Sequence, residues 1–161
     1  MTPTEQYIRV LTNLKSGELG LLRTHAGQGL DQTVDGFDLF TGLWWPLRQK
    51  NKAAPRREVA WLIAKLYAHR PIPQSEGAIA CQLRKRQPNS RSERFADRLD
   101  RMLLLPLSQI EPALRWALDV LASGGLGVNW VELTNDLSTW ERESTRLKWA
   151  AQYLEEGRRQ C

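Results

Sequence analysis

Apolar residues recur every three or four positions along nearly the whole chain, which is the spacing of an amphipathic α-helix. The clearest example follows Ser108, where Ile110, Leu114, Ala117 and Leu121 lie on one face of a helix. No stretch alternates apolar and polar residues between turn residues, as a half-buried strand does. The pattern therefore predicts an all-α protein of about eight or nine helices.

Breaks in this periodicity divide the chain into nine expected helices. They cover residues 4–15, 19–23, 37–44, 57–69, 75–85, 91–103, 109–123, 130–140 and 144–154. We expect Pro46 to end the third helix, because proline lacks the backbone N–H that a helix interior needs, and this leaves residues 48–57 as a loop. The helix over 57–69 is apolar on most sides, which predicts a central position in its lobe.

Turn and capping residues mark the ends of several of these helices. The segment Gln87-Pro88-Asn89-Ser90 reads as a linker and predicts two small lobes, 1–87 and 88–161. The glycines from 124 to 127 predict a helix end and a turn. Three pairs have the spacing of a capping box, the last of them weaker: Ser90 with Glu93, Ser108 with Glu111, and Asn129 with Glu132.

Composition fits a small globular protein with a basic surface. The chain has 161 residues, of which 42% are hydrophobic and 25% charged, and its formal net charge is +5. The basic balance favours a polyanionic partner, since Lys and Arg attract phosphates. Seven tryptophans are scattered along the helices, and we expect most of them in the core, with base stacking as the less favoured alternative.

Sequence features also suggest where the protein resides. The N-terminus lacks a signal-peptide layout, and no apolar run approaches the roughly 20 residues that span a bilayer. These features predict a cytoplasmic protein without membrane association. The cysteines Cys81 and Cys161 are expected to be free thiols, because Cys161 ends the chain.

Residues for catalysis are sparse. The only histidines are His25 and His69, which leaves too few ligands for a His/Cys metal site and no base for a cysteine nucleophile. The glycines from 124 to 127 lack the GxxxxGK[ST] frame of a phosphate loop. Asp97 and Asp100 share a helix face but lie among arginines, as in a solvated ion-pair face. We therefore expect no enzyme activity, no metal and no cofactor.

Arginine placement is the most informative feature of the chain. At roughly 100° per residue, four arginines of the helix over 91–103 fall within a sector of roughly 80°. They are Arg91, Arg94, Arg98 and Arg101. An adjoining face carries Phe95, Leu99, Met102 and Leu103, and the next carries Glu93, Asp97 and Asp100. Guanidinium groups spaced along a helix suit successive backbone phosphates, although a solvated face remains the alternative.

Two further basic runs strengthen the expectation of a nucleic-acid partner. Arg84, Lys85 and Arg86 precede the arginine helix, and the expected loop over 48–57 holds five basic residues and no acidic one. The arginine helix lacks the short preceding turn and the polar base-reading residues of a helix-turn-helix. Contacts with the phosphate backbone are therefore favoured over base reading.

Five segments form a distributed pattern along the chain. They are Leu14-Lys15-Ser16-Gly17 through Leu21-Leu22-Arg23, Ala54-Pro55-Arg56 before an apolar helix, Glu93-Arg94 with Leu99 and Arg101, Leu114-Arg115, and Asn129-Trp130-Val131-Glu132-Leu133 followed by Asp136-Leu137 and Trp140. In these segments the sequence resembles the CasB family, the small subunit of the type I-E CRISPR Cascade complex. The resemblance covers most of the chain in order and carries no catalytic signature.

This resemblance implies a non-catalytic subunit that packs head to tail with a second copy of itself and with other Cascade subunits. It would hold crRNA, target DNA and the displaced strand by their backbones and stabilise the R-loop, while base pairing supplies specificity. The candidate nucleic-acid-binding residues are Arg23, Arg48, Lys50, Lys52, Arg56, Arg57, Arg84, Lys85, Arg91, Arg94, Arg98, Arg101, Arg115 and Arg142. The alternative function is a helical adaptor that binds acidic protein partners.

Overall fold

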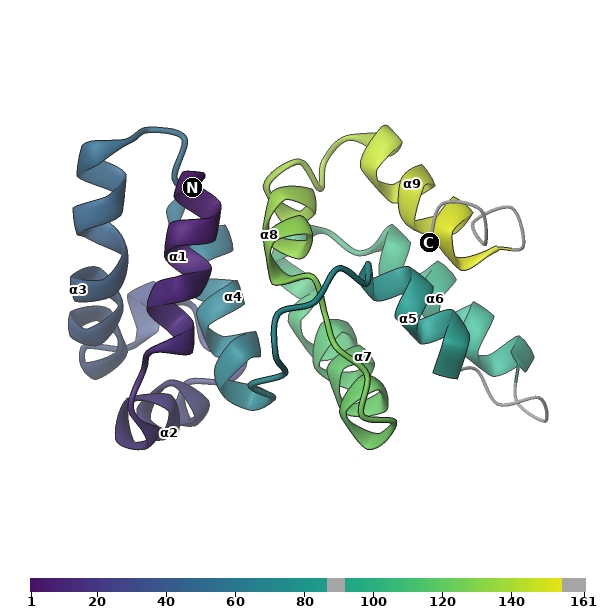
Figure 1. Ribbon diagram of the computed structural model, residues 1–161, viewed down its shortest axis with the longest axis horizontal. Helices are drawn as coiled ribbons and strands as arrows, with labels where there is room; N and C mark the ends of the chain where they lie inside the picture. The colour runs from purple at the N-terminus through teal and green to yellow at the C-terminus, as the bar shows by residue number, and fades with distance from the viewer. Residues whose placement is uncertain (87–91, 155–161) are drawn as a thin grey trace. The chain divides into compact units, whose positions relative to one another are not determined.

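A computed structural model describes residues 1–86 and 92–154, and this part of the chain consists of helices and the turns that join them (Figure 1). The α-helices are α1 (Pro3–Thr12), α2 (Ser16–Thr24), α3 (Asp35–Lys50), α4 (Arg57–His69), α5 (Ile79–Arg86), α6 (Ser92–Leu104), α7 (Glu111–Ser123), α8 (Trp130–Ser138) and α9 (Glu143–Tyr153). Two 3-10 turns, η1 (Leu30–Gln32) and η3 (Leu107–Gln109), lie between them. Within the described residues there is no strand, only an isolated bridge between Gln74 and Val128. The prediction of an all-α protein is confirmed.

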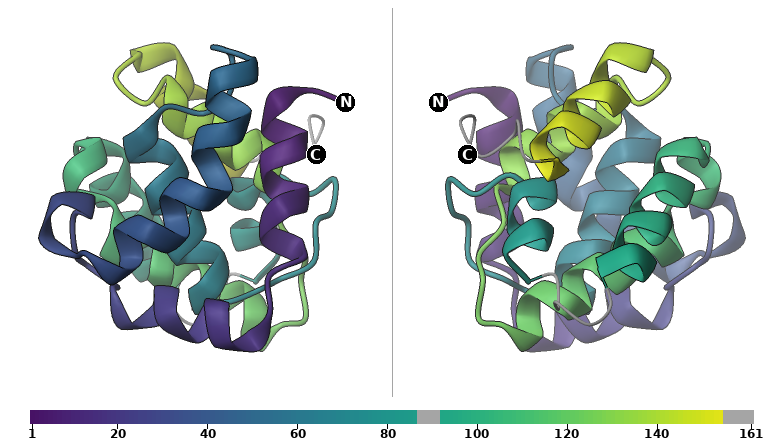
Figure 2. Two further views of the ribbon diagram at one scale, coloured as in Figure 1. Left: turned by 90° about the vertical axis from the view of Figure 1, so that its left-hand side faces the viewer. Right: turned by 90° about the vertical axis from the view of Figure 1, so that its right-hand side faces the viewer.

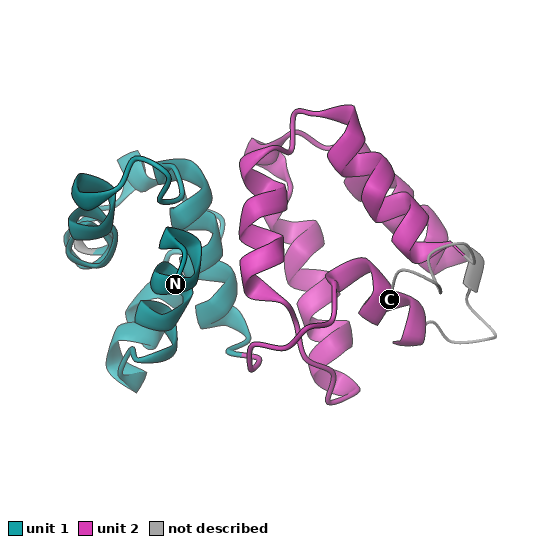
Figure 3. Ribbon diagram, turned by 45° about the horizontal axis from the view of Figure 1, so that its top comes forward, with its two compact units in different colours: residues 1–71 teal, residues 72–161 magenta. Residues whose placement is uncertain are grey.

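The chain forms two compact units, Met1–Pro71 and Ile72–Cys161 (Figure 3). The sequence placed the boundary 16 residues later, after residue 87 rather than after residue 71. The reason for the difference is α5, which packs against α7 and α9 and buries Ile79 and Leu83 in the second unit. The residues expected as a linker, 87–90, lie outside the described residues.

The first unit is built around α4. Every residue from Val59 to Ala68 is buried, which confirms the central position predicted for this helix. Helices α2 and α3 both pack against α4, and α1 packs against α3. Tyr7 of α1 also donates a 2.6 Å hydrogen bond from its buried hydroxyl to the carbonyl of Ala60. This bond joins α1 to the central helix.

Helix α3 continues through Pro46 to Lys50, so the prediction that proline ends this helix is wrong. In a regular α-helix the backbone N–H of residue 46 would donate to the carbonyl of Gly42, four residues earlier. Proline has no N–H, so this carbonyl loses its usual donor. Both residues are exposed, so water can satisfy that carbonyl, and Gly42 has no side chain to crowd the proline ring. Phe40 and Trp44 are buried on the opposite face and hold the helix against the core. The basic loop is correspondingly shorter than expected and covers residues 51–56.

The second unit packs α5 and α6 each against both α7 and α9 (Figure 2, right). Helix α7 ends where predicted, because Gly125 adopts a left-handed φ of 67° and the N–H of Leu126 returns to the carbonyl of Leu121. The segment before α5 lies along the start of α8, where Trp130 donates from its indole to the carbonyl of Ile72 at 2.7 Å. These contacts close the unit around three fully buried tryptophans, Trp130, Trp140 and Trp149.

The capping predictions have different outcomes. The side chain of Asn129 accepts a hydrogen bond from the backbone N–H of Glu132, as expected. The box expected from Ser108 and Glu111 does not form, because residues 107–109 make a 3-10 turn and Ile110 is the N-cap of α7. Ser90 lies outside the described residues, so its pairing with Glu93 stays a prediction.

The cysteine prediction is wrong at the internal position. Cys81 on α5 is 3% exposed and is disulfide-bonded, not a free thiol. Cys161 lies outside the described residues.

Candidate nucleic-acid interface

Helix α6 carries the arginine stripe, which consists of Arg94, Arg98 and Arg101 in the described part of the chain. All three side chains are exposed, whereas Leu99 and Met102 on the adjoining face are 2% and 1% exposed. Residues three and four positions apart on a helix have Cβ atoms about 5–6 Å from one another. The stripe is therefore a row of three guanidinium groups at the surface. Arg91, its expected fourth member, lies outside the described residues.

Arg98 is held by an aromatic contact with α7. Its guanidinium lies over the indole of Trp116, 4.6 Å from the ring centroid. Trp116 in turn meets Phe95 edge to face, with centroids 5.3 Å apart and ring planes at 65°. A guanidinium stacked on an indole uses its flat face, so its in-plane N–H groups remain directed outward as donors. The contact between α6 and α7 thus orients the middle arginine of the stripe.

Arg115 lies on α7, directly before Trp116 in the chain. Because α6 packs on α7, Arg115 and the arginine stripe lie on neighbouring helices. The Arg115 side chain is half-buried, and its Nε has no hydrogen-bond partner among the described residues. A buried N–H without an acceptor is unfavourable. The Nε of Arg115 is therefore an unsatisfied donor inside the second unit and is not itself exposed to a ligand.

Helix α5 divides its cations between structural and exposed positions. The Nη1 of Arg84 donates to the carbonyl of Leu154 and joins α5 to the end of α9. The Nη2 of Arg86 donates to the hydroxyl of Ser123 at 3.3 Å, at the end of α7. Lys85 is exposed, and within the described residues it makes no side-chain hydrogen bond or ion pair. Arg142 is likewise exposed and is the N-cap residue of α9.

In the first unit, three of the expected contacts have structural partners. Arg23 donates from Nε to the carbonyl of Ala68 at 2.6 Å, which satisfies the last turn of α4. The Nη1 of Arg48 donates to the carbonyls of Lys52 and Ala54, both at 2.6 Å. Arg56 lies 3.8 Å from Glu58. These arginines hold the loop and the helix end in place.

The remaining candidate residues of the first unit face solvent around the junction of α3 and α4. They are Lys50, Lys52 and Arg57, which are exposed and have no carboxylate partner in the described ranges 1–86 and 92–154. The structure therefore brings the residues predicted from 48 to 57 together at one end of the unit. Arg23, on α2, is engaged with the opposite end of α4, its C-terminal turn.

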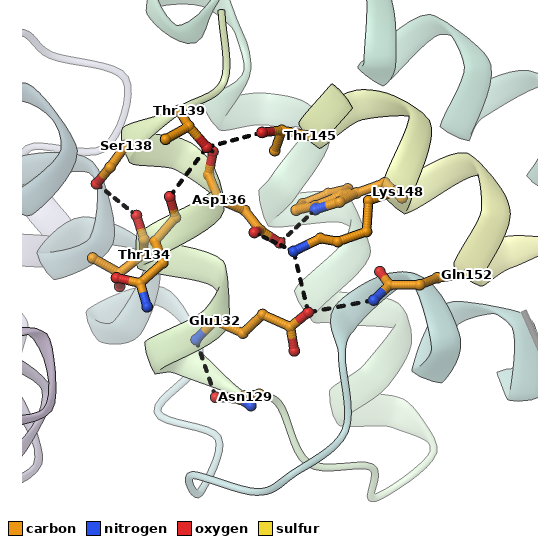
Figure 4. Close-up of polar contacts among 11 residues, drawn as sticks. Asn129, Glu132, Thr134, Asp136, Ser138, Thr139, Thr145, Lys148 and Gln152 are labelled. Carbon is orange, nitrogen blue, oxygen red and sulfur yellow. Dashed lines mark hydrogen bonds and ion pairs between the residues drawn. The ribbon is translucent and has the colours of Figure 1, made fainter. Parts of the chain in front are cut away.

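A partly buried polar network joins α8 to α9 (Figure 4). Asp136 is 7% exposed and accepts hydrogen bonds from Lys148 Nζ at 2.5 Å and from the Trp149 indole at 2.7 Å. Lys148 also lies 3.4 Å from Glu132, and Gln152 donates to the same carboxylate at 3.3 Å. Burial raises the pKa of Asp136 above its usual value, and the two hydrogen bonds offset only part of this effect. Lys148 is thus neutralised by carboxylates, and this side of the unit does not offer it to phosphate.

The sequence does not reveal the contacts of two further residues. Trp116 is predicted in the core with most of the tryptophans, because its spacing does not show that Arg98 covers it. Arg146 was not singled out, yet its Nη2 donates to the carbonyl of Glu141 at 3.2 Å and its Nε is buried without a partner in the described structure. No sequence signal distinguishes Arg146 from an ordinary exposed arginine of an amphipathic helix.

In ranges 1–86 and 92–154 no three His, Cys, Asp or Glu side chains gather in a way that could hold a metal ion. None of the helices described there has both the length and the apolar character that crossing a membrane requires.

The fold is that of solved CasB structures. The M. ruber CasB structure matches with a TM-score of 0.77 and 18% identity over 99% of this chain and 96% of that one. CasB from Thermobifida fusca matches with a TM-score of 0.72 and 15% identity, covering 93% and 94% of the two chains. CasB from Thermus thermophilus matches with a TM-score of 0.68 and 22% identity, covering 95% and 98%. No curated protein sequence matches significantly.

Family membership follows from the sequence itself. Residues 18–154 match the family of the CRISPR-associated protein Cse2, and the chain belongs to this family. The resemblance to CasB found in the sequence is thereby confirmed. Membership implies a CRISPR-associated Cascade subunit.

Proposed function

We propose that this protein is a non-catalytic small subunit of a type I-E Cascade complex that binds nucleic acid through backbone phosphates. The observation that carries the proposal is the arginine stripe of α6, three exposed guanidinium groups in a row with Arg98 fixed on Trp116. Arginine suits this role because it stays charged and offers bidentate donors to phosphate oxygens. Sequence specificity then comes from base pairing with the crRNA.

The ligands in this proposal are crRNA, target DNA and the displaced strand, and their retention stabilises the R-loop. Arg115 on α7 is a further candidate contact in this proposal; its side chain is half-buried and its Nε lies out of reach of solvent. The exposed cations Lys50, Lys52 and Arg57 supply a second surface in the first unit. Of the 14 candidates named from the sequence, Arg23, Arg48 and Arg84 contribute through the structure that they hold in place.

The protein partners in the proposal are other Cascade subunits and a second copy of the chain, packed head to tail. The protein would act in the cytoplasm, where it carries out no chemistry itself. We therefore expect the purified protein neither to cut nucleic acid nor to hydrolyse nucleotides. A nuclease activity that disappears when the protein's own carboxylates are substituted would contradict this part of the proposal.

A direct test compares a double variant of the stripe with a charge-matched control. Arg94→Ala with Arg101→Ala removes two positive charges and leaves the Arg98–Trp116 contact intact. Arg9→Ala with Lys15→Ala removes the same charge from exposed positions outside the residues that match the family. We expect the stripe variant alone to weaken binding, and to weaken it similarly for unrelated DNA sequences. If the two double variants weakened binding equally, the stripe would contribute only through the net charge of the protein, and the proposed contact would be wrong.

A further inference from the structure

Trp45 is the one tryptophan that the fold does not bury. Five of the seven indoles are at most 9% exposed, and Trp116 is half-buried beneath Arg98. Trp45 is 46% exposed, and its indole N–H has no hydrogen-bond partner within the described residues. Indoles that build a core usually hide their rings and satisfy their N–H, so Trp45 has no evident role in stability.

The Trp45 ring stands on a rigid base. Its neighbour Trp44 stacks on Phe40, with centroids 5.5 Å apart and planes at 10°. Trp44 also donates from its indole to the carbonyl of Pro55 at 2.6 Å. Trp45 leans against Trp44 with centroids 5.8 Å apart and planes at 50°. An exposed aromatic ring that is held in this way loses little conformational freedom when a flat ligand stacks on it.

Cationic residues follow Trp45 along the chain. Arg48 follows Trp45 by three positions on α3, so the two side chains share a face of the helix. The two carbonyl contacts of Arg48, together with a 2.8 Å hydrogen bond from Ala53 N to Asn51 Oδ1, fix the loop that presents Lys52 to solvent. Neither Arg48 nor Lys52 pairs with a carboxylate in the part of the chain that the structure describes. We name Trp45, Arg48 and Lys52 the Trp45 surface.

We propose that the Trp45 surface binds single-stranded nucleic acid, with one unpaired base stacked on the indole and a neighbouring phosphate on Lys52, whose loop Arg48 holds in place. This inference rests on the proposed function and adds to it the ligand class of the first unit. Aromatic platforms beside cationic side chains bind single strands without sequence preference, because every base has a flat face. In a duplex the bases are already stacked on one another, so the indole would discriminate against it.

The charges around α3 favour nucleic acid over a protein partner at this position. The other exposed apolar residues of the helix, Val34 and Phe37, lie at its start beside the exposed carboxylate of Asp38. Trp45 lies near the opposite end, where Arg48, Lys50 and Lys52 follow. A polyanion would be attracted to the C-terminal end of α3, where the cations follow Trp45, and repelled at its start, where Asp38 lies beside Phe37.

Phe37 therefore supplies a matched control. Trp45→Leu and Phe37→Leu each remove an exposed aromatic ring from the same helix, and Phe37 is 43% exposed. Binding is measured with the full-length protein and three probes: a labelled single strand, the same strand with abasic sites that keep the phosphates, and the duplex.

We expect Trp45→Leu to weaken binding of the intact single strand about fivefold or more, from the strength of base–aromatic stacking. Binding of the abasic strand and of the duplex should change less than twofold, and Trp45→Phe should restore most of the loss. Phe37→Leu should leave all three affinities unchanged. The dependence of affinity on salt should be unaltered in Trp45→Leu, because no phosphate contact is removed.

Three outcomes would overturn the inference. They are an equal loss for intact and abasic strands, no loss for either, and a defect of Trp45→Leu only in assembly with other subunits, which would assign Trp45 to a protein contact. Failure of the proposed function is distinguishable from these results, since it would appear as unchanged binding in the variants of the α6 stripe.

Discussion

The contact between Arg98 and Trp116 predicts a measurable coupling between stability and nucleic-acid binding. Trp116→Leu keeps an apolar side chain on α7 but removes the indole beneath the guanidinium. A cation–π contact at an exposed site contributes about 0.5–1 kcal/mol, and an edge-to-face aromatic pair about 0.5–1.5 kcal/mol. Loss of both contacts should lower the free energy of unfolding by about 1–2.5 kcal/mol in a urea titration.

The effect on binding should be smaller and should depend on Arg98. Without the indole, Arg98 must give up side-chain freedom when it meets a phosphate, which we expect to weaken affinity about two- to fivefold. In an Arg98→Ala background the same Trp116→Leu substitution should leave affinity unchanged, because the residue that it orients is gone. Equal losses of affinity in both backgrounds would show that Trp116 does not act through Arg98.

Two further predictions concern the α8–α9 side of the second unit, where the described contacts are structural. Burial raises the pKa of the Asp136 carboxyl in the folded protein above 3.8. The stabilisation that this carboxyl provides is therefore fully present below pH 3.8 and is lost as pH rises through the folded pKa. The difference in unfolding free energy between wild type and Asp136→Asn should therefore shrink as pH rises above 3.8, and a difference independent of pH would contradict this. Asn129→Ala removes the cap of α8 and the acceptor for Gln74, and should cost about 0.5–2 kcal/mol in urea unfolding without changing nucleic-acid affinity.

Local patterns in the sequence predict that the helices exist, because most of them bury one face and α4 is buried on all sides. Helix α4 spans Arg57–His69 as predicted, and α6 differs from its expected range by one residue at each end. The prediction was wrong at Pro46, where the sequence shows a helix breaker but not the buried Phe40 and Trp44 that hold the helix beyond it. It was also wrong at Ser108, whose spacing from Glu111 fits a cap although a 3-10 turn intervenes.

The sequence was sufficient to predict which cations belong to the candidate site. It could not separate the exposed cations from those that donate hydrogen bonds within the fold. Charge and helical projection indicated the stripe of α6, since these depend only on residues within one helix. The sequence could not show that Arg23, Arg48 and Arg84 donate to backbone carbonyls, because these contacts depend on tertiary or loop geometry. The same limit hid the exposed ring of Trp45, since one exposed tryptophan cannot be told from six covered ones by spacing.

The central claim, that the α6 stripe contacts phosphates, is tested most directly by the salt dependence of DNA affinity. The measurement uses wild type, Arg94→Ala with Arg101→Ala, and the charge-matched control Arg9→Ala with Lys15→Ala, each in the assembled complex. Loss of two phosphate contacts should flatten the slope of log K against log salt concentration by about 1.4–1.8, while the control keeps the wild-type slope. A stripe variant with unchanged slope and affinity would show that the arginines of α6 form a solvated face and contact no phosphate.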